Sequence, residues 1–272
     1  SRIPVRGTMS FLRALRAYRE PFVALAVTLS ALCVWRQQSP AAQADSSAGG
    51  DDATLEPEAL EAILAADAAG SAGTAPASAS SSPHPAGPPS KEKILLMGDS
   101  MVEVVAPRLA DYALENGHEI VPAIWYGSTT SAWAKSAELG AILREVNPSL
   151  VIVVLGSSEL TRRNIESRRP MLEALVKRVG SRKLYWMGPP NWRPDTGIND
   201  LLASVLGRDR FFRSAALQLT RKKDGIHPDA AGGRVWTSAF VRWLEAEGRY
   251  DIAMAEPTHE AAPIPARVLG TM

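Results

Sequence analysis

Two short motifs, far apart in the chain, contain the residues whose types and spacing could do chemistry. A Gly-Asp-Ser tripeptide ends at Ser100, and Asp224 and His227 stand three residues apart, followed by Pro228. A serine beside a His–Asp pair suits acyl transfer, because the imidazole can take the hydroxyl proton while the carboxylate orients the ring. Since Asp224 and His227 are so close in sequence, one loop can hold both. The motifs predict Ser100 as nucleophile, His227 as general base and Asp224 as its partner.

Each of these residues also has a structural interpretation. Ser100 could cap the helix predicted to follow it, since serine is a preferred N-cap residue. His227 could be a structural loop histidine, and Asp224 could cap the turn after it. The occurrence of all three together favours catalysis. The other histidine in this region, His118, follows Asn-Gly in a predicted turn, and we expect it to be solvated.

Alternating apolar runs and helical patterns fill the chain from residue 91 to about residue 250. The expected strands are Lys93–Met97, Glu119–Ile124, Leu150–Leu155 and Lys183–Met187. The expected helices are Val102–Asn116, Ser131–Val146, Ile165–Val179, Asp200–Leu206 and Ala230–Glu247. Alternation of strand and helix predicts a three-layer α/β/α sandwich with a mostly parallel sheet.

The carboxyl ends of the strands are the expected place for a site. Ser100, Gly127 and Gly156 all lie within three residues after predicted strands. In a parallel sheet these positions share one edge, and binding and catalytic residues gather there. A serine between a strand and a helix also lies near a helix N-terminus, where an oxyanion is stabilised.

Together these residues resemble the SGNH/GDSL hydrolase superfamily, over residues 91 to about 248. Gly98-Asp99-Ser100 is similar to its first sequence block, and the segment from Asp224 to Pro228, with the long helix after it, is similar to its last block. The resemblance implies a flavodoxin-like α/β fold and a Ser100–His227–Asp224 triad. The covalent serine mechanism that it implies needs no metal and no organic cofactor.

The two middle blocks of the resemblance concern the oxyanion hole. Gly127 looks like the glycine of the second block, whose backbone amide would donate to the oxyanion together with that of Ser100. The third block usually reads Gly-x-Asn-Asp, but here it is Gly-Ser-Ser-Glu, with Ser158 in place of the asparagine. A serine hydroxyl is shorter and rotatable, so Ser158 would be a less pre-organised donor, directly or through a water. We expect Glu159 to hold this loop.

Aromatic residues follow several predicted strands and suit carbohydrate rings. Trp125, Tyr126 and Trp192 are the candidates for substrate contact; ordinary packing is the alternative for each.

The rest of the chain differs in composition. Residues 1–36 combine arginines with an apolar run, Pro21–Trp35, which reads as a signal or membrane anchor with the rest of the chain outside the cytoplasm. Residues 37–90 are rich in Ala, Ser, Gly and Pro and contain no Lys or Arg before Lys91, so we expect a disordered linker. Residues 91–250 would form the hydrolase-like domain, and residues 251–272 a flexible tail.

Charge and cysteine content exclude some function classes. The 30 basic and 29 acidic residues nearly balance, which gives no argument for a nucleic-acid partner. The single cysteine, Cys33, excludes an intrachain disulfide and a Cys-based metal site.

The most favoured function is an exported serine esterase, periplasmic in a bacterium, that cleaves O-acyl and especially O-acetyl esters on cell-envelope glycans. The expected partner is an acylated small molecule or glycan, with membrane contact through the N-terminal segment alone. An O-acyltransferase acting on envelope polysaccharide or peptidoglycan is the first alternative, because only the acceptor differs. A catalytically weak glycan-binding or assembly protein is the second, and it is motivated by Ser158.

Overall fold

The computed structural model describes residues 91–270. The predicted anchor (1–36) and linker (37–90) lie outside the described residues. Within the described residues, no helix combines the length and apolar character that crossing a bilayer would require.

A six-stranded sheet, with every paired strand parallel, forms the centre of the domain. Its strands are β1 (Lys93–Gly98), β2 (Glu119–Ile124), β3 (Leu150–Val154), β4 (Lys183–Met187), β5 (Phe211–Phe212) and β6 (Arg267–Val268), in the order β5-β4-β3-β1-β2-β6. The first four match the predicted strands to within one residue at each end. The two-residue strands β5 and β6 were missed, because two residues carry no detectable period.

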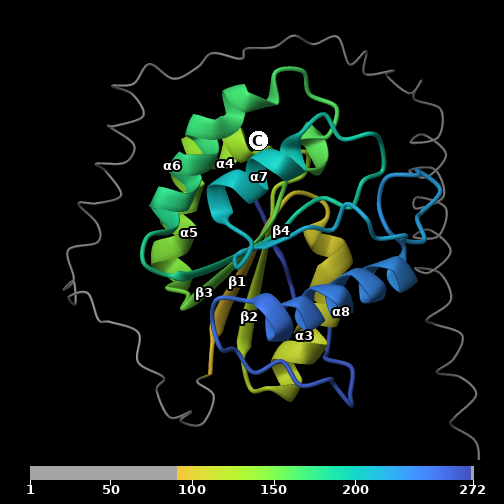
Figure 1. Ribbon diagram of the computed structural model, residues 1–272. Helices are drawn as coiled ribbons and strands as arrows, with labels where there is room; N and C mark the ends of the chain where they lie inside the picture. Colours follow the sequence, from red (N-terminus) through yellow and green to blue (C-terminus); the bar gives the residue numbers. More distant parts are fainter. Residues whose placement is uncertain (1–90, 271–272) are drawn as a thin grey trace, which may run out of the picture. The chain divides into compact units, whose positions relative to one another are not determined.

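Helices cover both faces of the sheet, which confirms the expected three-layer α/β/α fold (Figure 1). The α-helices are α3 (Val102–Glu115), α4 (Thr130–Lys135), α5 (Ala137–Val146), α6 (Arg169–Val179), α7 (Ile198–Leu206) and α8 (Ala230–Glu247), and single 3-10 turns span Ser157–Glu159 (η1) and Ile165–Arg168 (η2). Helices α3 and α8 lie on one face and α4 to α7 on the other. Alternate residues of β1 enter the two cores: Ile94 and Leu96 face α3 and α8, whereas Leu95 and Met97 face the opposite layer.

The helix predicted over residues 131–146 is two helices, separated at Ser136. The backbone there is extended, with φ −81° and ψ 148°, so the chain turns between α4 and α5. The buried Arg178 of α6 donates to the carbonyl oxygens of Ala134 and Ser136, both at 2.8 Å. Because the last carbonyls of a helix have no partner within it, this guanidinium stabilises the break.

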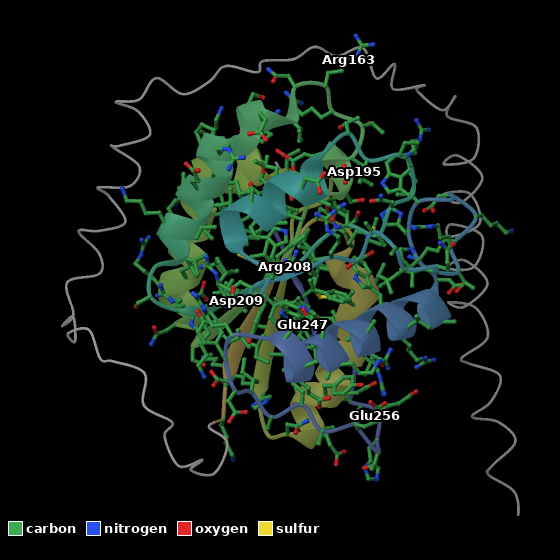
Figure 2. The ribbon with its side chains drawn as sticks, in the orientation of Figure 1. Arg163, Asp195, Arg208, Asp209, Glu247 and Glu256 are labelled. Carbon is green, nitrogen blue, oxygen red and sulfur yellow. The ribbon has the colours of Figure 1, made fainter. Side chains whose placement is uncertain are left out.

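Helix α7 begins two residues earlier than predicted. Asp195, in the loop before α7 (Figure 2), accepts hydrogen bonds from the backbone N–H groups of Gly197 at 2.8 Å and Ile198 at 2.9 Å. A side-chain acceptor for otherwise unpaired amides is how a helix start is stabilised.

Residues 251–270, expected to form a loose tail, instead pack along the domain. Ile252 and Met254 are buried against the core on the α3–α8 face, and the N–H of Ala261 donates to the buried Asp111 carboxylate at 2.8 Å. Glu256, labelled on the tail in Figure 2, pairs with Arg108 of α3. The tail then ends in β6, at the edge of the sheet.

His118 is buried, contrary to the expectation that it is solvated. Its Nδ1 accepts the backbone N–H of Glu92 at 3.1 Å, and its Nε2 lies 2.7 Å from the carbonyl oxygen of Ala253. The expectation failed because the tail covers this turn, and a contact over 135 residues of sequence leaves no local pattern.

Candidate active site

Ser100 stands where β1 ends and α3 begins. Strand β1 lies between β2 and β3, at the point where the strand order reverses, and sites in open parallel sheets form there. Gly98 permits the close approach of β3 at the end of β1: a Cβ atom on it would meet the carbonyl oxygen of Val154 at 2.0 Å. The Asp99 carboxylate, at 2.9 Å, accepts the N–H of Met101 at the helix start. Met101 is the N-cap of α3 and no side chain caps the helix there, so the capping alternative for Ser100 is not realised and its hydroxyl is left for another partner.

That partner is His227. The Oγ of Ser100 lies 2.7 Å from Nε2 of His227, and Nδ1 of His227 lies 2.8 Å from Oδ2 of Asp224. The three residues predicted to act together are thus joined in one hydrogen-bonded chain. The serine and the histidine are 127 residues apart in sequence.

The loop that carries Asp224 and His227 is held by its own backbone. The other carboxylate oxygen of Asp224 accepts the N–H groups of Ile226 at 2.8 Å and His227 at 3.0 Å. Gly225 between them has φ +69°, a conformation that glycine adopts without strain. One carboxylate therefore shapes the loop and orients the ring.

These hydrogen bonds also determine the charge of Asp224. The hydrogen bond from the His227 ring has the largest effect, and together with the two backbone N–H bonds it lowers the pKa of Asp224 to about 2. The carboxylate therefore stays ionised at any pH near neutral and accepts the proton on Nδ1. Nε2 is then free to accept the Ser100 hydroxyl proton, which is the tautomer that a general base needs.

Arg221 connects this loop to the segment after β4. Its guanidinium donates to the carbonyl oxygen of Ile226 within the loop and, at 3.2 Å, to that of Asn191 in the segment after β4. The backbone N–H of Lys222 also donates to the carbonyl oxygen of His227 at 2.8 Å. The histidine is thus placed by contacts on both sides of its own loop.

Gly127 and Ser158, the other expected oxyanion donors, lie in the loops after β2 and β3, at the same edge as Ser100. Gly127 is exposed and has φ +68°, in a turn fixed to the end of β1 by the bond from the Trp125 N–H to the Gly98 carbonyl oxygen at 2.9 Å. Ser158 is exposed in the single 3-10 turn after β3. Their role as donors remains a prediction.

The buried carboxyl group of Glu159 supports these loops. Glu159 accepts the Thr130 hydroxyl at 2.7 Å and the Thr130 N–H at 3.2 Å, and Arg168 lies 3.7 Å away. It therefore ties the loop after β3 to the start of α4, as expected for an acid that holds this loop. Burial raises its pKa despite these partners.

Asp99 belongs to the Gly98-Asp99-Ser100 motif, but no role for its side chain was predicted from the sequence. It is fully buried, and its Oδ2 has no hydrogen-bond partner among the described residues. Burial, partly offset by the N–H of Met101, raises its pKa to about 7, and the nearby Glu159 charge adds to the rise. The available signal was its position directly after an apolar strand, where a carboxylate side chain is poorly solvated.

The three candidate aromatic contacts do not form one cluster. Trp125 packs edge-on against the buried Trp133, with ring centroids 5.6 Å apart. Trp192 is partly buried and donates to the carbonyl oxygen of Ser157 at 3.4 Å. Tyr126 is 49% exposed and donates to Glu103, so it alone presents much of its ring to solvent.

No group of three His, Cys, Asp or Glu side chains within residues 91–270 could hold a metal ion.

Comparison with known proteins gives structural similarity at low sequence identity. No protein-family model matches the chain, and no curated protein matches it. Among solved structures it is similar to the psychrotrophic esterase EstA from Pseudoalteromonas sp., with TM-score 0.41, 17% identity, and coverage of 57% of this chain and 97% of that one. It is also similar to a G-D-S-L family protein from Desulfitobacterium hafniense, with TM-score 0.40, 15% identity, and coverage of 55% and 98%.

A third similar structure is the C-terminal catalytic domain of peptidoglycan O-acetyltransferase A from Streptococcus pneumoniae, with TM-score 0.39, 14% identity, and coverage of 58% of this chain and 94% of that one. At these TM-scores the three structures superimpose on this chain only in part. The fold assignment therefore rests on the strand order, and the chemistry rests on the geometry of Ser100, His227 and Asp224.

Proposed function

We propose that this protein is a serine esterase that cleaves acyl esters through a covalent acyl-enzyme on Ser100. The observation that carries the proposal is the unbroken hydrogen-bond chain from Ser100 through His227 to Asp224, at 2.7 Å and 2.8 Å. Both distances lie in the range expected for a nucleophile, its base and the group that orients the base.

The reaction follows from this geometry. Nε2 of His227 takes the hydroxyl proton as Oγ of Ser100 bonds to the ester carbonyl carbon, and the carbonyl oxygen becomes an oxyanion. The bond to the alcohol oxygen then breaks, and the alcohol leaves with the proton from His227. Water next gives a proton to His227 and attacks the acyl group; the carboxylic acid leaves, and the proton returns to Ser100. Asp224 stabilises the imidazolium in both halves.

The oxyanion would be stabilised by the backbone amides of Ser100 and Gly127, with Ser158 as a third donor. The amide of Ser100 precedes α3, whose N-terminus carries partial positive charge. Gly127 supports this assignment by its exposure and its place in a turn held to the end of β1.

The narrower proposal is an exported enzyme acting on O-acetyl groups of cell-envelope glycans. It is supported by the arginines and the apolar run in residues 1–36 and by the exposed Tyr126 ring near the site.

An O-acyltransferase is the second candidate, because a sugar hydroxyl could replace water in the second half-reaction. The openness of the site supports it: the side chains of His227 and Asp224 are 26% and 43% exposed, which leaves room for an acceptor larger than water.

The deciding experiment is rapid-mixing hydrolysis of p-nitrophenyl acetate by the full-length chain and its Ser100→Ala variant. We expect a burst of p-nitrophenol, close to one per protein, that is absent in Ser100→Ala. Ser204→Ala, which removes a hydroxyl on α7 that donates to the Leu201 carbonyl oxygen of the same helix, is the matched control and should keep the burst. Equal background rates in wild type and Ser100→Ala would refute the proposal. Adding O-acetyl acceptors such as chitooligosaccharides then separates transferase from esterase by the acetylated product.

A further inference from the structure

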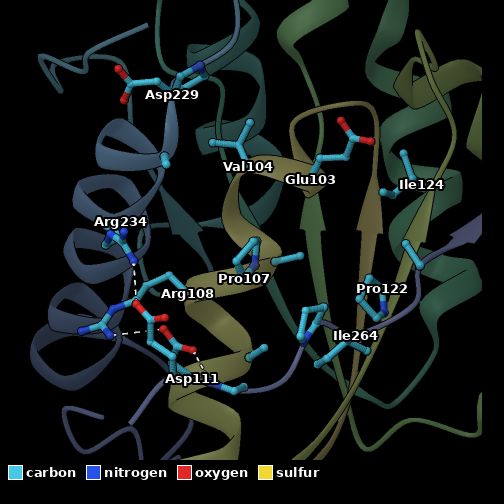
Figure 3. Close-up of a pocket in the computed structure, with 18 of the residues that line it drawn as sticks. Glu103, Val104, Pro107, Arg108, Asp111, Pro122, Ile124, Asp229, Arg234 and Ile264 are labelled. Atoms are coloured by element: carbon cyan, nitrogen blue, oxygen red, sulfur yellow. Dashed lines mark hydrogen bonds and ion pairs between the residues drawn. The ribbon is translucent and has the colours of Figure 1, made fainter. Parts of the chain in front are cut away.

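A groove of about 700 Å³ runs along α3 on the face that also carries α8 (Figure 3). Helix α3 lines it together with β2, the start of α8 and the tail around residues 260–268. Its volume falls within the roughly 300–1,000 Å³ typical of small-molecule sites. The triad residues do not line the groove, so it is a feature additional to the site described above.

One end of the groove is lined by close sequence neighbours of the candidate site residues. Pro228 directly follows the proposed base, Tyr126 directly precedes the proposed oxyanion glycine, and Glu103 lies about one helical turn after the proposed nucleophile. The neighbours of three separate site residues therefore border the same cavity. A ligand bound in the groove would have one end close to Ser100.

The body of the groove is apolar. Val104 and Pro107 of α3, Ile124 of β2, and Ile264 and Val268 of the tail line it. Ile264 and Val268 are 36% and 47% exposed, although large apolar side chains are usually covered. This surface suits a chain of methylene groups better than a sugar ring.

The arginines at the far end have acidic partners, and Arg108 also pairs with Glu256 of the tail. Arg108 lies 3.3 Å from Asp111, and Arg234 lies 3.3 Å from Glu260 (Figure 3). The hydrogen bond that the Ala261 N–H donates to the Asp111 carboxylate also holds the tail over this end. These pairs offset each other's charge, so an uncharged ligand end fits here better than an ion.

We propose that this groove binds a linear apolar chain of the ester substrate, longer than an acetyl group. The inference rests on the proposed acyl-transfer function of Ser100 but departs from the narrower O-acetyl glycan proposal, since an acetyl group would leave nearly all of the groove empty. The chain belongs to either the acyl or the alcohol part of the ester, and both have the same methylene chemistry. Each methylene transferred from water to such a surface favours binding by up to about fourfold.

The test measures kcat/KM of the full-length chain for two ester series. The first varies the acyl chain from p-nitrophenyl acetate to p-nitrophenyl octanoate, and the second varies the alcohol from ethyl acetate to octyl acetate. We expect kcat/KM to rise about two- to fourfold per methylene in one series. A rise in the first series identifies an acyl chain, and a rise in the second identifies an alcohol chain.

Two groove variants and one control decide whether binding in the groove causes the rise in kcat/KM with chain length. Ala106→Phe fills the groove from the partly buried face of α3, and Ile264→Asp places a charge on its exposed tail wall. Both variants should reduce the dependence of kcat/KM on chain length. Ala246→Phe, the same change at an exposed position of α8 outside the groove, should keep it. A flat dependence in wild type, or a full rise in both groove variants, would overturn the proposal.

Failure of the esterase proposal itself has a different signature. If wild type hydrolyses no ester, calorimetric titration of full-length Ser100→Ala with 1-octanol tests the groove alone. Binding that is lost when Ala106→Phe is added would support the groove, and absence of binding would refute it.

Discussion

At the scale of single residues, Asp224 has two roles, because its two carboxylate oxygens bond to different groups. Asp224→Asn should keep the loop bonds to one oxygen but lose the acceptor that keeps the proton on Nδ1 of His227. An amide that donates to Nδ1 would leave the proton on Nε2, which could then not accept from Ser100. We expect kcat to fall by about 10²–10⁴-fold with little change in stability. Steady-state kinetics and thermal melting of the variant check this, and an unchanged kcat would show that another group orients the ring.

Substitutions of Ser158 test whether its side chain donates to the oxyanion. If its hydroxyl donates to the oxyanion, Ser158→Ala should lower kcat by about tenfold or more, towards the 10²–10³-fold measured elsewhere for loss of one such donor. Ser158→Asn, which restores a longer amide donor, should raise kcat above that of Ser158→Ala. Identical kcat values in wild type and both variants would place the hole on backbone amides alone.

The raised pKa of Asp99 predicts that the stability of the folded protein depends on pH. Its pKa is about 7 in the folded protein against 3.8 for an ordinary aspartate, so the folded protein holds this proton more tightly than the unfolded chain does. The contribution of Asp99 to stability therefore falls as the pH rises from about 4 to about 7, and is constant above that.

Asp99→Asn carries no charge to bury and should gain stability relative to wild type over that window. We expect the gain to grow by on the order of 3 kcal/mol between about pH 5 and about pH 8. Urea unfolding of both proteins at the two pH values measures it. A constant difference between them would mean that Asp99 is ionised in both states at both pH values.

At the scale of elements, Arg178 stabilises the break between α4 and α5. Arg178→Leu keeps a buried apolar stem but leaves the carbonyl oxygens of Ala134 and Ser136 without these donors. We expect the free energy of unfolding to fall by about 2–4 kcal/mol. Arg144→Leu, at an exposed position of α5, is a control that should cost much less. Comparable losses in the two variants would contradict this role for Arg178.

At the scale of the whole molecule, the tail belongs to the domain. Truncation after Tyr250 removes Ile252 and Met254 from the core and deprives Asp111 of its bond from Ala261. Each buried apolar side chain contributes about 1.5–3 kcal/mol, so the truncated chain should unfold at a clearly lower temperature. Thermal unfolding of the two chains checks this. A truncation after Leu269, which keeps β6, is the control and should melt like the full chain.

The predictable part of this protein depends on short-range patterns. Apolar runs identified four strands of the sheet, and their alternation with helices implied parallel pairing. The three-residue spacing of Asp224 and His227 already confined both to one loop, since so few residues cannot separate them widely. Ser100 was identifiable because it follows a strand.

Only the tertiary structure decided which distant surfaces meet. It brought Ser100 within 2.7 Å of His227 across 127 residues and covered His118 with the tail. It also buried Asp99 with no partner for Oδ2 among residues 91–270. It also added β5 and β6, whose few residues are strands only because an existing sheet edge pairs with them. Local spacing determines local geometry through the stiffness of a short chain, whereas burial, pKa and the groove along α3 depend on packing between segments that no local pattern relates.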